Sequence, residues 1–105
     1  MQNSKNEILD FLKILKPELT SKGIVSLGLF GSIAKGTNTS DSDIDIVYET
    51  SDIFINSHKG WSAFTYLNIN LRDKIIKKFN TPVDMFDLNS SSPLKEKVKK
   101  EALYV

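Results

Sequence analysis

The chain has 105 residues, enough for one domain with a single hydrophobic core, and we expect residues 1–105 to form one domain. Its net charge is +1, so no overall field favours nucleic acid or an anionic membrane. The absence of cysteine excludes disulfides and thiolate metal sites. No apolar run approaches the roughly 18 residues of a membrane span, and the polar start MQNSKNEILD differs from a signal peptide. These features predict a cytoplasmic protein without a membrane partner.

The first third of the chain predicts a helix, a strand and a tight turn. Apolar residues recur at helical spacing before Gly23: Ile8, Phe11, Leu12, Leu15 and Leu19. Ser4 can cap this helix, and Pro17 should break or kink it near its end. Residues 24–30, IVSLGLF, are typical of a buried strand. Residues 31–36, GSIAKG, predict a turn with one helical turn, followed by a polar loop at 37–42.

The remaining residues predict two more strands and two more helices. Residues 43–49 alternate like a strand, 50–60 suggest a surface loop, and 61–79 have the apolar period of a long helix, in which we expect Trp61 and Phe64 to pack. Residues 83–88 predict a third strand, and a helix should follow Ser92-Pro93. The fold class is α/β (α+β), with a small mixed sheet of about three strands and helices packed mainly on one face.

Asp43 and Asp45 lie two residues apart on the second predicted strand, so their side chains should share one face. Two carboxylates about 4 Å apart repel by around 4 kcal/mol at an effective dielectric constant near 20. Solvation can absorb this repulsion, and a divalent cation would turn it into a binding site. Oxygen ligands without nearby histidine or cysteine suit Mg²⁺ or Mn²⁺, and Mg²⁺ usually shares the phosphates of its substrate.

A phosphate site is therefore expected next to the paired aspartates. Gly31 follows the first strand directly and allows close approach of the backbone to a ligand. Ser32 offers a hydroxyl and an N–H at the start of a helical turn. Lys35, one turn later, can add a positive charge, although a surface lysine explains it equally well.

A third carboxylate should complete the site, and Asp84 fits best because it lies inside the third predicted strand. Asp87 is the rival, but it is out of phase with Asp84 and nearer the strand end. Alternation along a strand predicts that Asp84 shares its face with Phe86 and that Asp87 does not.

Together these residues give the chain a family resemblance. The chain resembles the minimal nucleotidyltransferase family of the polymerase-beta-like nucleotidyltransferase superfamily. The resemblance lies in Gly31-Ser32, followed after ten residues by Asp43-Ile44-Asp45 and later by Val83-Asp84. The segments FGSIAKG and SDSDID also match the FGS-x-A-x-G and SD-x-D motifs of the family.

The resemblance implies a catalytic and metal-binding set, Asp43, Asp45 and Asp84, with two Mg²⁺ ions or Mn²⁺ in their place. It implies that Gly31 and Ser32 hold the β and γ phosphates of a nucleoside triphosphate, ATP by expectation. Lys35 lies where the family often has arginine. Lysine keeps the positive charge, but it lacks the planar guanidinium group that can donate two parallel hydrogen bonds to a phosphate. The implied reaction is transfer of a nucleoside monophosphate to an acceptor hydroxyl.

The acceptor is expected to be a partner protein. Val47, Phe86 and Leu88 share parity with the aspartates and would leave an apolar face bare if helices cover only the opposite face. The resemblance implies a HEPN-domain toxin as the partner, with this chain as an antitoxin that adenylylates it. Two alternatives stay open: a noncatalytic antitoxin that only binds, and a nucleotidyltransferase acting on a small molecule such as an aminoglycoside. A nucleic-acid partner is disfavoured, because only Arg72 among the 14 basic residues is arginine.

Overall fold

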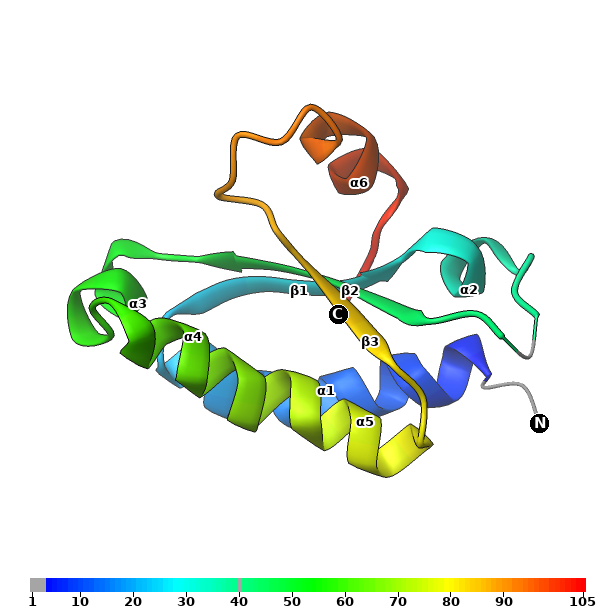
Figure 1. Cartoon of the computed structure of the whole chain (residues 1–105), viewed down its shortest axis with the longest axis horizontal. Helices are drawn as coiled ribbons and strands as arrows, with labels where there is room; N and C mark the ends of the chain where they lie inside the picture. The colour runs from blue at the N-terminus through cyan, green and yellow to red at the C-terminus, as the bar shows by residue number, and fades with distance from the viewer. Residues whose placement is uncertain (1–3, 40) are drawn as a thin grey trace.

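A computed structural model describes residues 4–39 and 41–105, so Ser40 of the predicted loop at 37–42 lies outside the described residues. The fold is built on a four-stranded mixed sheet in the order β3-β2-β1-β4 (Figure 1). β1 (Ile24–Phe30) pairs antiparallel with β2 (Ile44–Thr50) and with β4 (Leu103–Tyr104), whereas β3 (Val83–Asp87) runs parallel to β2. The expected sheet of about three strands lacked β4, because a two-residue strand is too short to produce an alternating pattern.

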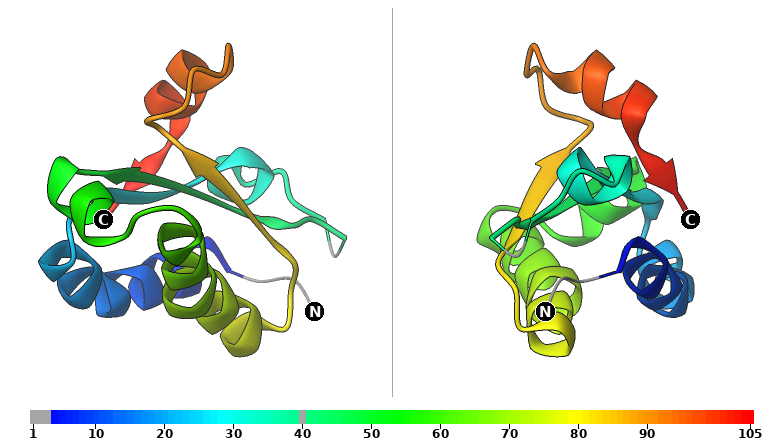
Figure 2. Two further views of the ribbon diagram at one scale, coloured as in Figure 1. Left: turned by 60° about the vertical axis from the view of Figure 1, so that its left-hand side comes forward. Right: turned by 90° about the vertical axis from the view of Figure 1, so that its right-hand side faces the viewer.

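One face of the sheet is covered by a layer of helices (Figure 2). The layer contains α1 (Lys5–Ser21), α4 (Trp61–Leu67), a π-helical turn (Asn68–Arg72) and α5 (Asp73–Phe79). The Ser4 hydroxyl accepts a hydrogen bond from the Glu7 N–H at 3.3 Å and caps α1 as predicted. Of the break or kink expected at Pro17, the break is wrong, since α1 continues to Ser21. Proline removes one backbone hydrogen bond, and burial of Leu19 against the core holds the last turn in place.

A short helix, α3 (Asp52–Ser57), lies within the stretch that suggested a surface loop. Its anchor is Phe54, which is 1% exposed and packs against the rings of His58 and Tyr66. A helix this short carries too few apolar positions to show a period, so the sequence pattern misses it.

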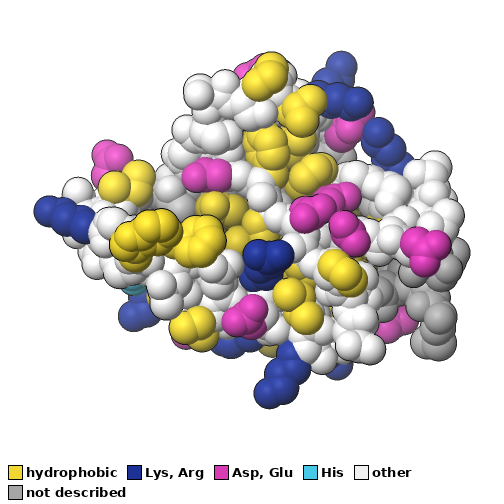
Figure 3. Space-filling view, viewed as in Figure 1, with side chains coloured by type: hydrophobic (Ala, Val, Ile, Leu, Met, Phe, Trp, Pro, Cys, Tyr) yellow, Lys and Arg dark blue, Asp and Glu magenta, His cyan; other side chains and the backbone are white. Residues whose placement is uncertain are grey.

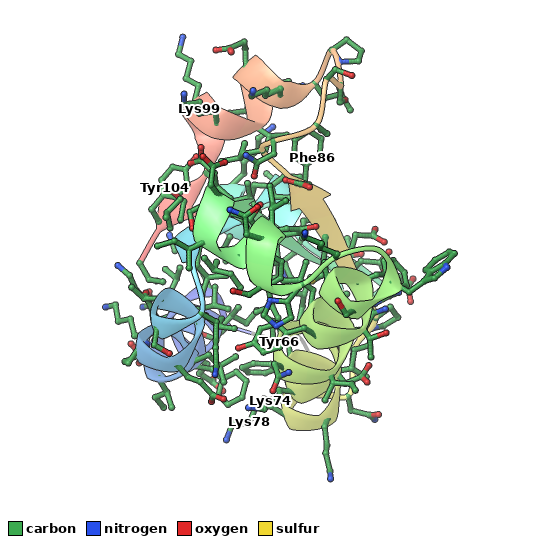
Figure 4. The ribbon with its side chains drawn as sticks, turned by 90° about the vertical axis from the view of Figure 1, so that its left-hand side faces the viewer. Tyr66, Lys74, Lys78, Phe86, Lys99 and Tyr104 are labelled. Atoms are coloured by element: carbon green, nitrogen blue, oxygen red, sulfur yellow. The ribbon has the colours of Figure 1, made fainter. Side chains whose placement is uncertain are left out.

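The opposite face of the sheet is covered by α6 (Lys95–Glu101), which stands above the strands in Figure 2. Val98 of α6 packs with Val47 and Leu88, and Phe86 lies at the edge of this cluster. Figure 4 shows Phe86 on the α6 side and Tyr66 among the helices of the other layer. The expected bare apolar face is therefore wrong: the chain covers it with its own helix, which begins at Lys95 and ends at Glu101.

The main core lies between the sheet and the lower helical layer. It includes Ile8 and Leu12 of α1, Ile44 and Ile46 of β2, and Leu71 of the π-helical turn. Across residues 4–39 and 41–105, no helix combines the length and apolarity that crossing a bilayer requires.

Candidate active site

Gly31 joins the end of β1 to α2 (Gly31–Lys35) and has a φ angle of 76°, a conformation that favours glycine. A Cβ atom at this position would lie 2.9 Å from Cγ of Asp45 and would overlap its carboxylate oxygen. The space that a side chain would fill is thus occupied by the Asp45 carboxylate. The Gly-Ser turn and the acidic strand are therefore in direct contact, as the predicted site requires.

Asp45 and Asp84 are neighbours on adjacent parallel strands, in the same register position. Asp43 immediately precedes the first residue of β2. Burial raises the pKa of Asp45 from 3.8 to about 6, and the charges of Asp84 and then Asp43 add to the rise. Asp84 and Asp43 thus both lie close enough to Asp45 to affect its ionisation.

Asp87 is placed differently, as the alternation along β3 predicted. It stands opposite Tyr48 in the register, and its carboxylate accepts a hydrogen bond from the Asn89 N–H at 2.8 Å. Burial, followed by the charge of Asp87, raises the pKa of Tyr48 to about 12. Tyr48 packs against the core on the helical-layer side of the sheet. Asp87 therefore belongs to a different environment from the Asp43, Asp45 and Asp84 group.

Ser32 and Lys35 lie on α2, beside the carboxylates. Ser32 is half-buried, and its carbonyl accepts a hydrogen bond from the Thr37 N–H at 2.9 Å. The Lys35 ammonium forms an ion pair with Glu101 of α6 at 3.3 Å, so in this structure its charge is directed at a carboxylate. Sequence reasoning missed Glu101, because nothing in its local pattern indicates that α6 folds back over α2.

The carboxylates supply only oxygen donors, the chemistry that Mg²⁺ and Mn²⁺ prefer. Within the described residues, no group of three or more histidine, cysteine, aspartate or glutamate side chains is arranged to hold a metal ion by itself. Magnesium usually binds one or two protein carboxylates and takes its other ligands from water and substrate phosphates. The donor set of Asp43 and Asp45 therefore fits such an ion in the company of a nucleotide.

A hollow of about 260 Å³ adjoins Asp84 on the side facing α4 and the π-helical turn, and Asn68 and Arg72 line it. In Figure 3, acidic, basic and hydrophobic side chains share this face of the molecule. Trp61 and Phe64 do not pack in the core, since they are 82% and 59% exposed; they pack on each other at the start of α4, with ring centroids 6.1 Å apart. Helical periodicity places residues on faces of a helix, but it does not show where the neighbouring layer stops.

Comparisons with known proteins agree with this arrangement. Residues 13–105 match the family described as Polymerase beta, Nucleotidyltransferase. A comparison with curated proteins finds no significant match.

Solved structures share the fold. One, assigned as a minimal nucleotidyltransferase, is 19% identical with a TM-score of 0.71, over 97% of this chain and 96% of that one. A toxin–antitoxin structure with AMP-PNP is 26% identical with a TM-score of 0.62, over 97% of this chain and 72% of that one. A chain assigned as a nucleotidyltransferase from Sulfolobus solfataricus is 20% identical with a TM-score of 0.56, over 95% of this chain and 80% of that one. With the family match covering most of its length, the chain belongs to the polymerase beta nucleotidyltransferase family.

Proposed function

We propose that this protein transfers AMP from ATP to a hydroxyl group of a partner protein, and that it acts as the antitoxin of a HEPN-domain toxin. The observation that carries the proposal is the pairing of Asp45 with Asp84 across two parallel strands, with Gly31 against the Asp45 carboxylate. This arrangement joins an acidic cluster to the turn that the family resemblance assigns to phosphate binding.

The nucleotide would lie between α2 and the acidic cluster. Gly31 and Ser32 would hold the β and γ phosphates, and Lys35 would reach them after leaving Glu101, with which it pairs at 3.3 Å. Asp43 and Asp45 would hold two Mg²⁺ ions, or Mn²⁺, with Asp84 as a further ligand. When bound, the ions neutralise charge on the triphosphate and lower the pKa of an attacking hydroxyl.

The acceptor hydroxyl approaches from the Asp84 side. The bond between its oxygen and the α-phosphorus forms, and the bond from the α-phosphorus to the bridging oxygen breaks. Pyrophosphate leaves with that electron pair, and a carboxylate oxygen of Asp84 receives the hydroxyl proton before releasing it to water. The products are an AMP ester of the acceptor and pyrophosphate, and the chemistry needs no histidine. His58, which stacks on Phe54 with ring centroids 4.6 Å apart, packs in the helical layer.

The toxin–antitoxin structure with AMP-PNP supports the choice of ATP and of an antitoxin role. The HEPN identity of the toxin comes from the family resemblance. The apolar sheet face no longer supports a partner, because α6 covers it. A partner is supported instead by Phe64, which lines the hollow next to Asp84, and by Trp61, which packs on Phe64; both rings are largely exposed.

The test is incubation of the purified chain with ATP labelled at the α-phosphate, Mg²⁺ and a purified HEPN-domain protein. We expect label on the partner, and a loss of about a thousandfold in rate when Asp43→Asn and Asp45→Asn are combined, since metal charge stabilisation is worth several kcal/mol. Asp41→Asn, an exposed aspartate in the preceding loop, is the matched control.

Label transfer that survives the double substitution would refute the mechanism. Neutralisation of the toxin without any label transfer would favour the noncatalytic antitoxin instead. Labelling of aminoglycosides in place of protein would favour the small-molecule alternative.

A further inference from the structure

A groove runs along the outer edge of β3. Its first hollow, about 260 Å³, is lined by Val83, Asp84 and Met85. A second hollow of about 280 Å³ lies beside Asp87 and Asn89 and is walled mainly by residues of α3, α4 and β2. Both hollows share Tyr48, Phe64 and Leu67 as walls, so they lie next to each other between the sheet and α4, and together we call them the groove. The edge that β3 itself offers, five residues at about 3.3 Å each, is roughly 17 Å long.

The strand wall of this groove is an edge of the sheet. β3 is the last strand in the sheet order, so no strand of the described residues pairs with its outer side. The Ile44 N–H donates to the Pro82 carbonyl, and the Leu88 N–H donates to the Tyr48 carbonyl. Even-numbered residues of β3 therefore direct their N–H and C=O groups toward β2. By alternation, those of Val83, Met85 and Asp87 point away from β2, and of these the Asp87 carbonyl already accepts a hydrogen bond from the Ser90 N–H at 3.0 Å.

The helical wall has two unusual features. Asn68 and Arg72, which line the groove, are the first and last residues of the π-helical turn. Such turns are rare and frequently lie at functional sites. Phe64 of the same wall forms a T-shaped pair with Trp61, which lines neither hollow; the ring centroids are 6.1 Å apart, and both residues are largely exposed. Exposed aromatic pairs of this kind are enriched where proteins meet.

The charges of the groove are also distinct. Within the described part of the chain, Arg72 is the cationic residue of the lining, and Asp84 and Asp87 are its acids. An occupant with an acidic residue opposite Arg72 would complement this arrangement. Asp84 borders both the groove and the carboxylate cluster, so an occupant of the groove reaches the site of chemistry directly.

We propose that the acceptor binds as an extended segment of the partner protein, paired with the outer edge of β3, with its hydroxyl residue opposite Asp84. The inference rests on the proposed function and specifies how its acceptor is recognised. An extended segment satisfies the outward N–H and C=O groups of Val83 and Met85, which a docked helix or a small molecule would leave unpaired. Its side chains alternate between the two faces of the sheet.

Because of this alternation, the bound segment contacts both the carboxylate cluster and the apolar residues of the groove. The hydroxyl residue projects to the face of Asp84 and Asp45, where its oxygen attacks the α-phosphorus and pyrophosphate leaves. Its neighbours project to the other face, against Tyr48, Phe64 and Leu67. Trp61 extends the contact beyond the end of the groove. Directly opposite residues on paired strands have Cβ atoms about 5 Å apart, which brings the acceptor side chain beside Asp84.

The first experiment uses synthetic nine-residue peptides as the acceptor, each with a central tyrosine, alternating apolar and polar residues, and one glutamate. Each peptide is made in two versions, which carry backbone N-methyl groups on one or the other alternate set of amides. Strand pairing uses every second amide. We therefore expect one version to lose label transfer by at least about tenfold in kcat/KM, and the other to keep it.

The second experiment changes the protein edge. Met85→Pro removes the outward N–H and places a ring in the groove, a position where an edge strand tolerates proline. Met85→Ala removes the side chain and keeps the N–H, so it sets the baseline. We expect kcat/KM for the peptides to be at least about tenfold lower for Met85→Pro than for Met85→Ala, with equal affinity for ATP and Mn²⁺ by calorimetry.

Trp61→Ala combined with Phe64→Ala should raise KM for the same peptides and leave nucleotide affinity unchanged. Ile14→Ala is the matched control, because Ile14 is 72% exposed on α1, away from the groove. Equal loss for both N-methylated versions, or equal rates for the two Met85 variants, would overturn the proposal. So would nucleotide binding without labelling of any peptide, or labelling only of a second copy of this chain. Failure to bind ATP with Mn²⁺ at all would instead refute the proposed function itself.

Discussion

Replacement of Asp45 by asparagine should stabilise the nucleotide-free protein while it removes activity. The pKa of Asp45 is raised from 3.8 to about 6 by burial and then by the charges of Asp84 and Asp43. The folded state therefore holds a proton on Asp45 more tightly than the unfolded state does. This contribution to stability is fully present below about pH 4 and is lost as the pH rises through about 6. At pH 8 the wild-type protein carries the full cost of an ionised Asp45.

The size of the effect follows from the shift. Each pKa unit corresponds to about 1.4 kcal/mol, so the rise to about 6 sets an upper limit of about 3 kcal/mol. The side chain is only half-buried, and screening by solvent reduces the value to roughly 1 kcal/mol. For a domain of this size, 1 kcal/mol changes Tm by about 4–8 °C. We expect Asp45→Asn to raise Tm by that amount at pH 8 and by little at pH 4.

The assay is thermal unfolding of wild type and Asp45→Asn at pH 4, 6 and 8, without metal or nucleotide. Asp41→Asn, at an exposed position, controls for the loss of one negative charge. Mn²⁺ with a nonhydrolysable ATP analogue should then stabilise the wild type more than the variant, because binding to the folded state adds RT ln(1 + [L]/Kd). The reasoning would be refuted if the Tm of Asp45→Asn did not exceed that of wild type at pH 8. It would also be refuted if the difference in Tm were as large at pH 4 as at pH 8.

Three further substitutions test the parts of the site separately. Gly31→Ala should lower the free energy of unfolding by about 2 kcal/mol or more and weaken ATP binding. The added Cβ clashes with the Asp45 carboxylate, and alanine is strained at the positive φ of this position. The control is Gly36→Ala, which has the same φ of 76° and no atom within 4 Å of the added Cβ. In thermal unfolding it should lose only the stability that alanine loses by adopting a positive φ. Glu101→Gln should release Lys35 and tighten ATP binding by up to about fivefold in calorimetry, whereas unchanged affinity would place Lys35 outside the nucleotide site. Val98→Ala should lower the free energy of unfolding by about 2 kcal/mol in urea titration, and a negligible loss would show that α6 is not packed on the sheet.

Local sequence was sufficient for the elements with long apolar patterns and for the acidic strand. The alternation around Asp43, Asp45 and Asp84 depends only on the two-residue period of a strand, and the structure brings these carboxylates together. The turn after β1 was likewise predictable, because a glycine between a strand and a helical turn indicates an unusual backbone conformation. The backbone geometry of each of these elements arises from residues close along the chain, whereas the meeting of Asp45 with Asp84 also needs the pairing of β2 with β3.

Only the tertiary structure decided what lies over each face. Three features join segments that are distant in the sequence. They are the placement of α6 against Val47 and Leu88, the ion pair of Lys35 with Glu101, and the pairing of β4 with β1. Their free energy comes from contacts that no local period records, so α6 left no sign that it would cover the apolar face. The exposure of Trp61 and the open edge of β3 have the same origin, since a residue is exposed only where no other segment reaches it.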